Sequence, residues 1–249
     1  MDLSERTDTA TARHPWEQAR AAFLLDILDE AGVLAAGGSV LDVGSGDGWL
    51  AQQLVARSSC AVTCWDPHFA DDDVARLRSP RLLPVREPPR GPFDTALMLD
   101  VMEHVDDDDA FVDDVLARVR PGGRVLVSVP AWPRLFSSHD RALAHVRRYT
   151  PAACRRVLRR AGLHIDRSGG FFHGLIAPRA AAVVVERLRG TPSTASTAGI
   201  GGWSHGPLLT GAITAALRAE LRVSKAAAAA GVDVPGLSFF ALCTLVELR

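Results

Sequence analysis

Short apolar runs alternate with segments of helical periodicity along the first two thirds of the chain. Runs of four to seven mostly apolar residues, which are typical of buried strands, cover residues 39–43, 61–65, 82–85, 93–99 and 124–129. Helical spacing of apolar positions covers residues 15–35, a segment that starts at Trp49, and about 107–119. Strands and helices that alternate in this way predict βαβ units and a mostly parallel sheet.

The last third of the chain continues this pattern less regularly. Thr150 and Pro151 predict the N-cap and the first position of a helix that ends at Gly162. The further expected elements are a strand from residue 163, helices over 174–189 and 207–231, and a closing strand over 237–248. Residues 190–206, between those two helices, are rich in Gly, Ser and Thr, which predicts a mobile loop.

The length of the chain indicates one large α/β domain. Its 249 residues, of which 47% are apolar, are enough for one sizeable core. We expect about seven strands with helices on both faces of the sheet. Residues 1–13 are polar and predict a disordered tail, so the domain should span 14–249. Within the domain, 174–231 is expected to form a helical lid over a substrate, with the mobile loop inside it.

Charge and cysteine content argue against several classes of protein. The formal net charge of −1 provides no strong field for nucleic acid or an anionic membrane. No apolar run approaches the ~20 residues of a membrane span, and the polar first residues lack the apolar region of a signal peptide. The four cysteines lack disulfide or zinc spacing, which predicts reduced core thiols, no metal site and a cytoplasmic location.

Residues 42–48 read Asp-Val-Gly-Ser-Gly-Asp-Gly and lead from a predicted strand into a predicted helix. Glycines are needed where the backbone turns tightly and approaches a ligand. A dinucleotide site requires G-x-G-x-x-G, but Trp49 stands at the third glycine position and Gly48 comes one place early. Asp42 and Asp47 would repel a diphosphate, whereas they tolerate a ligand that carries sulfonium and ammonium groups.

Three further segments follow the glycine loop. They are Cys-Trp-Asp-Pro at 64–67, Phe-Asp-Thr-Ala-Leu at 93–97 followed by Leu-Asp-Val-Met-Glu-His-Val at 99–105, and Arg-Pro-Gly-Gly at 120–123. Together the four segments resemble the motifs of class I S-adenosylmethionine-dependent methyltransferases, over roughly residues 15–170. That resemblance implies a Rossmann-like sheet whose last strand is antiparallel. It also implies S-adenosylmethionine as cofactor and S-adenosylhomocysteine as product.

The same resemblance implies a set of cofactor contacts. These are Asp42, Gly44, Ser45, Gly46, Asp66, Pro67, Glu87, Leu99 and Asp100. The glycine loop would pack against the methionine part, and the backbone at Leu99 and Asp100 would line the same end. Asp66 would accept hydrogen bonds from both ribose hydroxyls, or it only forms a turn at the strand end. Glu87 would meet the adenine amine, or it is a solvated loop charge.

The segment after the fifth predicted strand concentrates His, Asp, Arg, Trp and the single Tyr of the chain. A hydroxyl or protonated amine must lose a proton as it receives a methyl group, so we expect a base in this segment. His139 is the first candidate, because it follows strand five at the mouth of the expected crevice. Asp140, His145 and His104 are the alternatives. Each of them could instead be structural, capping a helix or packing a loop.

These features predict methylation of an O, N or C atom of a small molecule. In the resembled families, N-P-P-[YF] and D-P-P-Y mark amino methylation of nucleic-acid bases and of glutamine, but Leu-Asp-Val-Met stands at 99–102 here. A composition rich in Ala and Arg suggests a GC-rich bacterial genome, and a role in bacterial specialised metabolism is a separate hypothesis. Two rivals stay open. One is a catalytically silent binding protein of the same fold, and the other is an RNA or protein methyltransferase, which would need an extended basic face.

Overall fold

Seven strands form one sheet in the computed structural model, which describes residues 13–189 and 205–246. The strands are β1 (Ser39–Val43), β2 (Ala61–Trp65), β3 (Leu82–Val85), β4 (Phe93–Leu99), β5 (Val119–Pro130), β6 (Leu163–Phe171) and β7 (Ser238–Leu245). Their spatial order is β3-β2-β1-β4-β5-β7-β6. Neighbours from β3 to β5 pair in parallel, whereas β7 pairs antiparallel with both β5 and β6. The predicted fold class is therefore confirmed.

The first four strands have the bounds that the apolar runs predict. The fifth strand is longer than the predicted 124–129, because Val119 already pairs with Phe93 and the ladder continues through a register shift. The turn expected at 121–123 is thus an irregular part of β5 rather than its boundary, and that prediction was wrong. β7 lies within the predicted 237–248.

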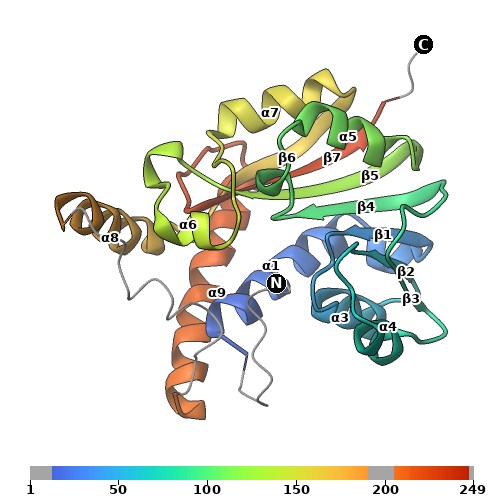
Figure 1. Ribbon diagram of the computed structural model, residues 1–249, viewed down its shortest axis with the longest axis horizontal. Helices are drawn as coiled ribbons and strands as arrows, with labels where there is room; N and C mark the ends of the chain where they lie inside the picture. The colour runs from blue at the N-terminus through green and yellow to red at the C-terminus, as the bar shows by residue number, and fades with distance from the viewer. Residues whose placement is uncertain (1–12, 190–204, 247–249) are drawn as a thin grey trace.

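Helices cover both faces of the sheet (Figure 1). They are α1 (Pro15–Glu30), α2 (Val33–Ala36), α3 (Trp49–Arg57), α4 (Asp71–Leu77), α5 (Asp108–Leu116), α6 (Ser138–Ala142), α7 (Pro151–Arg160), α8 (Ile176–Arg189) and α9 (Pro207–Ala229). One apolar core joins α5 and α7 to the sheet, and a second joins α1, α3, α4 and α9 to the opposite face. α8 projects from the molecule (Figure 1).

Single residues determine where two of the helices end or begin. The expected helix over 15–35 is two helices, because Gly32 has a φ of +77° that a right-handed helix does not continue. α7 begins as predicted. The Thr150 hydroxyl accepts a hydrogen bond from Ala153 N at 3.1 Å, and Pro151 is the first helical residue.

Some sequence predictions fall on residues outside the described part of the chain. These are the disordered tail, apart from Arg13, and the mobile loop, apart from His205 and Gly206. Among the helices that the structure describes, none is long and apolar enough to cross a bilayer. The four cysteines are free and buried, as expected for reduced core thiols, and they are Cys60, Cys64, Cys154 and Cys243.

α9 contributes directly to one of the two cores. Leu217, Leu221 and Ala228 are buried in the cluster that α1 and β6 share. The contact with β6 is close at Gly169, where an added Cβ would lie 3.0 Å from the Cβ of Ala228. The second half of α9 is therefore part of the core, while the lid role of 174–231 stays a prediction.

We expect Leu221→Ala to lower the free energy of unfolding by about 2–5 kcal/mol, because it opens a cavity in a packed core. Leu221 is 3% exposed, whereas Leu208 on the same helix is 90% exposed. Leu208→Ala is therefore the matched control and should change stability by less than about 0.5 kcal/mol. Urea unfolding followed by circular dichroism measures both variants. Equal stabilities would mean that α9 is not part of the folded core.

Candidate functional site

The carboxyl ends of β1, β2, β4 and β5 lie side by side at one edge of the sheet. Ligands of open α/β sheets bind beyond these ends, at the point where the strand order reverses. That point lies between β1 and β4, since β2 and β3 extend the sheet on one side and β5 on the other. The loops after these four strands therefore form the candidate site.

The loop after β1 packs closely against two neighbouring segments. Gly44 and Gly48 have φ values of +61° and +70°, which favour glycine. An added Cβ at Gly44 would lie 2.7 Å from Val101 Cγ2, in the loop after β4. An added Cβ at Gly48 would lie 2.6 Å from Leu77 Cδ2 of α4. The third glycine thus lies in close contact with α4.

Asp66, directly after β2, fastens its own loop to the glycine loop. Its Oδ2 accepts a hydrogen bond from Gly46 N at 2.9 Å, and its Oδ1 accepts one from His68 N at 2.9 Å. A carboxylate oxygen has two lone pairs, so each oxygen keeps the capacity to accept from a ligand hydroxyl. This geometry is compatible with the expected ribose contact, which stays a prediction.

Buried polar groups flank the glycine loop. Asp42 is 4% exposed, and burial raises its pKa to about 7, opposed in part by the charge of Arg20. Asp47 is also buried and pairs with Arg13. The hydroxyl of Ser45 is buried and has no hydrogen-bond partner among the described residues. A ligand that brings an ammonium and a sulfonium group would satisfy these groups, so the residues present fit S-adenosylmethionine.

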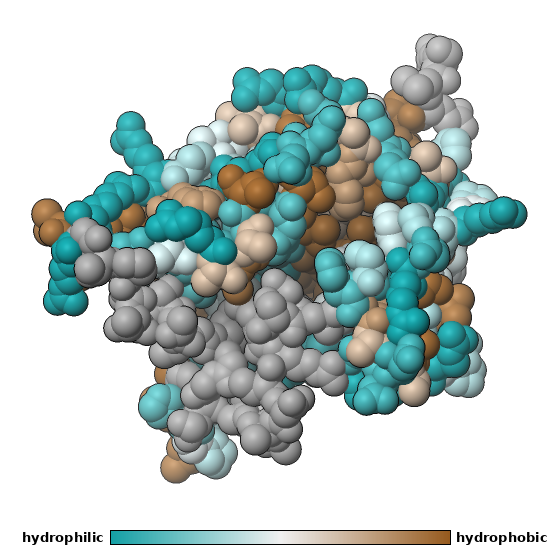
Figure 2. Space-filling view, viewed as in Figure 1, coloured by the Kyte–Doolittle hydropathy of each residue, from teal (hydrophilic) through white to brown (hydrophobic). Residues whose placement is uncertain are grey.

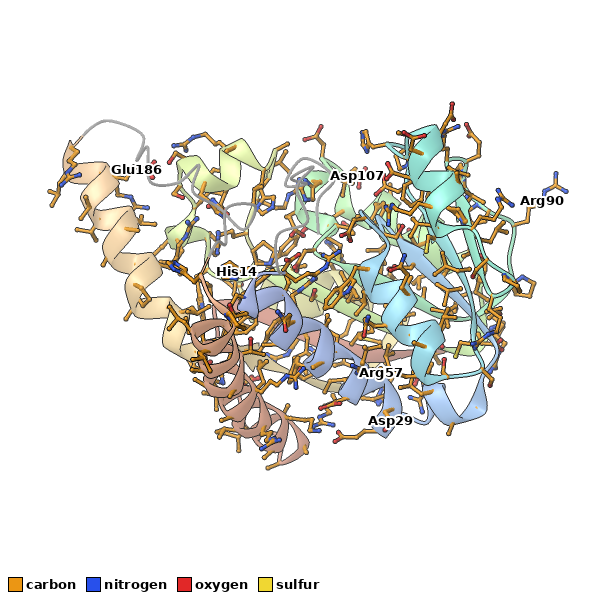
Figure 3. The ribbon with its side chains drawn as sticks, turned by 90° about the horizontal axis from the view of Figure 1, so that it is seen from below. His14, Asp29, Arg57, Arg90, Asp107 and Glu186 are labelled. Atoms are coloured by element: carbon orange, nitrogen blue, oxygen red, sulfur yellow. The ribbon has the colours of Figure 1, made fainter. Side chains whose placement is uncertain are left out.

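Arg20 is a site residue that sequence reasoning missed. It reaches from α1 to the ends of β4 and β5, with Nη2 2.7 Å from the Asp100 carboxylate and 3.2 Å from Ser128 Oγ. Ser128 Oγ donates in turn to Asp100 Oδ1 at 2.9 Å. Figure 3 labels His14 and Asp29 near the two ends of α1, which lies between α9 and α3. No local pattern marks Arg20, because its partner Ser128 is 108 residues away.

The remaining predicted cofactor residues lie at the same edge. Leu99 ends β4 and is 9% exposed. Pro67 is exposed after β2, and Glu87 is exposed in the loop after β3. Their contacts with a cofactor stay predictions.

A second group of side chains surrounds the fully buried carboxylate of Asp140, after β5. It accepts hydrogen bonds from Ser137 N at 2.9 Å, Arg148 Nε at 2.6 Å and Arg179 Nη2 at 2.5 Å. His145 Nδ1 lies 3.3 Å from its Oδ1. Burial acts in the opposite direction, but the His145 hydrogen bond and the two arginine charges hold the pKa of Asp140 well below its usual range. Because an ionised carboxylate only accepts, His145 donates from Nδ1.

His145 also faces the turn after β4. Its Nε2 lies 4.0 Å from Glu103 Oε1, and its ring meets that of His104 edge-on with 4.7 Å between centroids. Glu103 is 0% exposed, and neither of its oxygens has a hydrogen-bond partner in the part of the chain described. Burial and the charge of Asp100 raise the pKa of Glu103 well above its usual range. His104 and His145, separate candidates in the sequence, thus lie together with Glu103, which the sequence did not single out as a site residue.

His139, the first candidate for a base, lies on α6, a helix that the sequence pattern does not predict. It is partly buried, and its backbone N–H donates to Ser137 Oγ at 3.2 Å. α6 is held to α8 through Glu186 (labelled in Figure 3), whose carboxylate accepts from Ser138 N at 2.9 Å and from Ser138 Oγ at 2.8 Å. The role of His139 as a base stays a prediction.

Comparison with known proteins relates this architecture to one family. The family model described as Methyltransferase domain matches residues 16–168. A ubiquinone biosynthesis O-methyltransferase of Paramagnetospirillum magneticum is 38% identical over 94 residues, covering 34% of this chain and 37% of the relative. A protein of Mycolicibacterium smegmatis named "Probable S-adenosylmethionine-dependent methyltransferase" is 31% identical over 150 residues, covering 56% of this chain and 57% of the relative. The matched part of this chain therefore spans 37% of the length of the first relative and 57% of the length of the second.

One solved structure covers nearly the whole chain. The [4+2]-cyclase SpnF matches with a TM-score of 0.57 at 18% sequence identity, covering 99% of this chain and 90% of that one. At this identity the match shows a shared fold and no more.

We expect Asp66→Ala to weaken binding of S-adenosylhomocysteine by about 1–3 kcal/mol, because the ribose hydroxyls and Gly46 N–H lose their acceptor. Calorimetric titration gives the affinity, and thermal unfolding shows that the variant is folded. Asp71→Ala is the control, since the Asp71 side chain is 96% exposed at the start of α4. An affinity equal to that of the control would place the ligand elsewhere.

The raised pKa of Asp42 predicts that cofactor affinity depends on pH. Because burial moves this pKa from 3.8 to about 7, Asp42 is mostly protonated below pH 7 in the free protein. A ligand ammonium favours the ionised form, so binding releases a proton. We expect affinity for S-adenosylhomocysteine to rise between about pH 5.5 and pH 7, by at most about tenfold per pH unit. Calorimetry at several pH values should show no such slope in Asp42→Asn, and a persisting slope would assign the proton to another group.

Proposed function

The chain belongs to the Methyltransferase domain family of class I S-adenosylmethionine-dependent methyltransferases, and from this premise we propose that it methylates a hydroxyl oxygen of a small molecule. The bound cofactor supplies an electrophilic methyl group on a sulfonium. The residues of this chain align the acceptor with that methyl group, exclude water and remove the acceptor proton.

One arrangement carries the proposal. The glycine loop after β1, Asp66 after β2 and Asp100 after β4 meet at the reversal of strand order. The Asp66 carboxylate holds the loop through Gly46 N. The buried hydroxyl of Ser45 is left without a partner among the residues described. Since a buried polar group without a partner is costly, this loop is best explained by a polar ligand that completes its hydrogen bonds.

The proposed acceptor site adjoins this loop. Asp100 and Glu103 belong to the same turn after β4, and His145 approaches that turn from the segment after β5. An acceptor aligned with a methyl group near Asp100 would therefore lie against His104 and His145. A proton must leave a hydroxyl group as it is methylated, and His139 on the adjoining α6 is the proposed base.

Two observations favour a hydroxyl group of a small molecule. The relative from Paramagnetospirillum magneticum is named an O-methyltransferase, which supports an oxygen acceptor. The net charge of −1 argues against the extended basic face that an RNA substrate needs. If the acceptor atom is a nitrogen or a carbon instead, the following test will show it.

Matched pairs of acceptors test the proposal. Phenols, catechols and enols are each paired with the amine of the same skeleton and incubated with S-adenosylmethionine that carries a labelled methyl group. We expect label in the hydroxyl member of a pair, at a rate that rises as the hydroxyl ionises. His139→Ala should lower this rate by about 10²–10⁴-fold and leave S-adenosylhomocysteine affinity unchanged.

His164→Ala is the control for that variant, because the His164 side chain is 70% exposed on β6, away from the strand ends that form the site. Label in the amines alone would contradict the proposed hydroxyl acceptor. Binding of S-adenosylhomocysteine without transfer to any acceptor would favour the rival, a protein of this fold that does not methylate.

A further inference from the structure

We propose that Glu103, His104 and His145 bind a divalent transition-metal ion at the acceptor side of the site. The sequence predicts no metal site, because these residues come from two segments with no motif spacing between them. In the folded chain, the 3-10 turn Met102–His104 follows β4 and His145 follows α6. The fold alone brings the three side chains together.

The distances suit one ion. One ligand atom from each of the three residues lies within 4.8 Å of the other two, and His145 Nε2 and Glu103 Oε1 are 4.0 Å apart. Ligand atoms around a tetrahedral zinc ion lie about 3.3 Å apart, given metal–ligand bonds of ~2.0–2.2 Å. Binding of one ion therefore requires these ligand atoms to lie somewhat closer together than they do without it.

The environment of Glu103 is a second, independent indication of a cation at this site. Its carboxyl group is fully buried, and both oxygens are without a hydrogen-bond partner in the described part of the chain. The nearby Asp100 carboxylate offers Glu103 no compensation and already has Arg20 as its own partner. A buried carboxylate is retained when a cation compensates it. An ion held between Glu103 and the two imidazoles provides that compensation.

His145 is oriented as a metal ligand before any ion binds. Because its Nδ1 hydrogen-bonds to the Asp140 carboxylate, Nε2 is the ring nitrogen available to an ion, and it is the atom that faces Glu103. Histidine ligands commonly donate their other ring nitrogen to a carboxylate in this way. Asp140 is itself fixed by Arg148 and Arg179. These two arginines therefore position the imidazole through the carboxylate.

The ligand set indicates the class of ion. Two imidazoles and one carboxylate suit zinc, manganese or ferrous iron better than magnesium or calcium, which prefer oxygen ligands. Three protein ligands leave further coordination positions open. A hydroxyl that occupies one of them loses its proton more readily. This catalytic role rests on the proposed function, whereas binding of the ion does not.

When the ion takes part, every atom and charge of the methyl transfer is accounted for. The acceptor hydroxyl gives up its proton to His139 or to water. Its oxygen then forms the O–CH₃ bond as the S–CH₃ bond of the cofactor breaks, and the bonding electron pair goes to sulfur. The ion changes neither its charge nor its oxidation state.

Calorimetric titration of chelator-treated, full-length protein with Mn²⁺ and Zn²⁺, without cofactor or acceptor, tests the site. We expect one ion per chain, and at least a tenfold loss of affinity in Glu103→Gln and in His145→Ala. His164→Ala is the matched control, because it removes a histidine that is 70% exposed on β6, outside the site, and should bind the ion as the unmodified protein does. Thermal unfolding identifies any variant that fails to fold, and His104→Gln then replaces it.

The outcomes separate this proposal from the proposed function. Absence of binding to the unmodified protein, or equal binding by the ligand variants and the control, overturns the metal site. Full methyl transfer by the metal-free protein overturns the part of the ion in the reaction. Binding of one ion without methyl transfer to any acceptor supports the site and contradicts the proposed function.

Discussion

The buried carboxylate of Asp140 is the charge on which the acceptor side of the molecule depends. Its hydrogen-bond donors come from the start of α6, from the segment before α7 and from α8. Each hydrogen bond to a charged group contributes about 1.5–3 kcal/mol, and several are needed to offset the cost of burying the charge. Loss of Arg148 or Arg179 would leave part of that charge uncompensated. One side chain therefore holds three elements and His145 in a fixed relation.

α8 shows the consequence of this arrangement. It joins the rest of the molecule through polar contacts, with Arg179 on Asp140 and Glu186 on the start of α6. Apolar residues of its outer part, among them Val184 and Leu188, are exposed by 52% and 82%, and brown side chains appear on α8 in Figure 2. Since these charged contacts hold α8 together with a single buried apolar residue, Val183, the position of α8 is coupled to the geometry around His145.

The cofactor side is organised differently, by packing. α1 is anchored in the core through Phe23, whose ring stacks on Phe171 with 5.2 Å between centroids. This packing fixes Arg20 of the same helix against Asp100. The turn after β4 thus carries two acidic groups in different environments. Asp100 is neutralised by an arginine from α1, whereas Glu103 is buried without a partner in the residues described, and this difference points to a cation at the acceptor side.

The sequence by itself determined the features that depend on neighbouring residues. Buried parallel strands appear as short apolar runs, so β1 to β4 were predicted with their observed bounds. The glycine loop and the Thr150 cap were likewise recognisable, because a turn or a cap needs particular residues within a few positions. β5 was misjudged because pairing with β4 overrides the breaking tendency of its Pro-Gly-Gly segment. Only the tertiary structure could bring Arg20 to Ser128, 108 residues away, or Arg179 to Asp140, 39 residues away. Such pairs depend on the distances that strand order and helix packing create, and a one-dimensional pattern does not contain those distances.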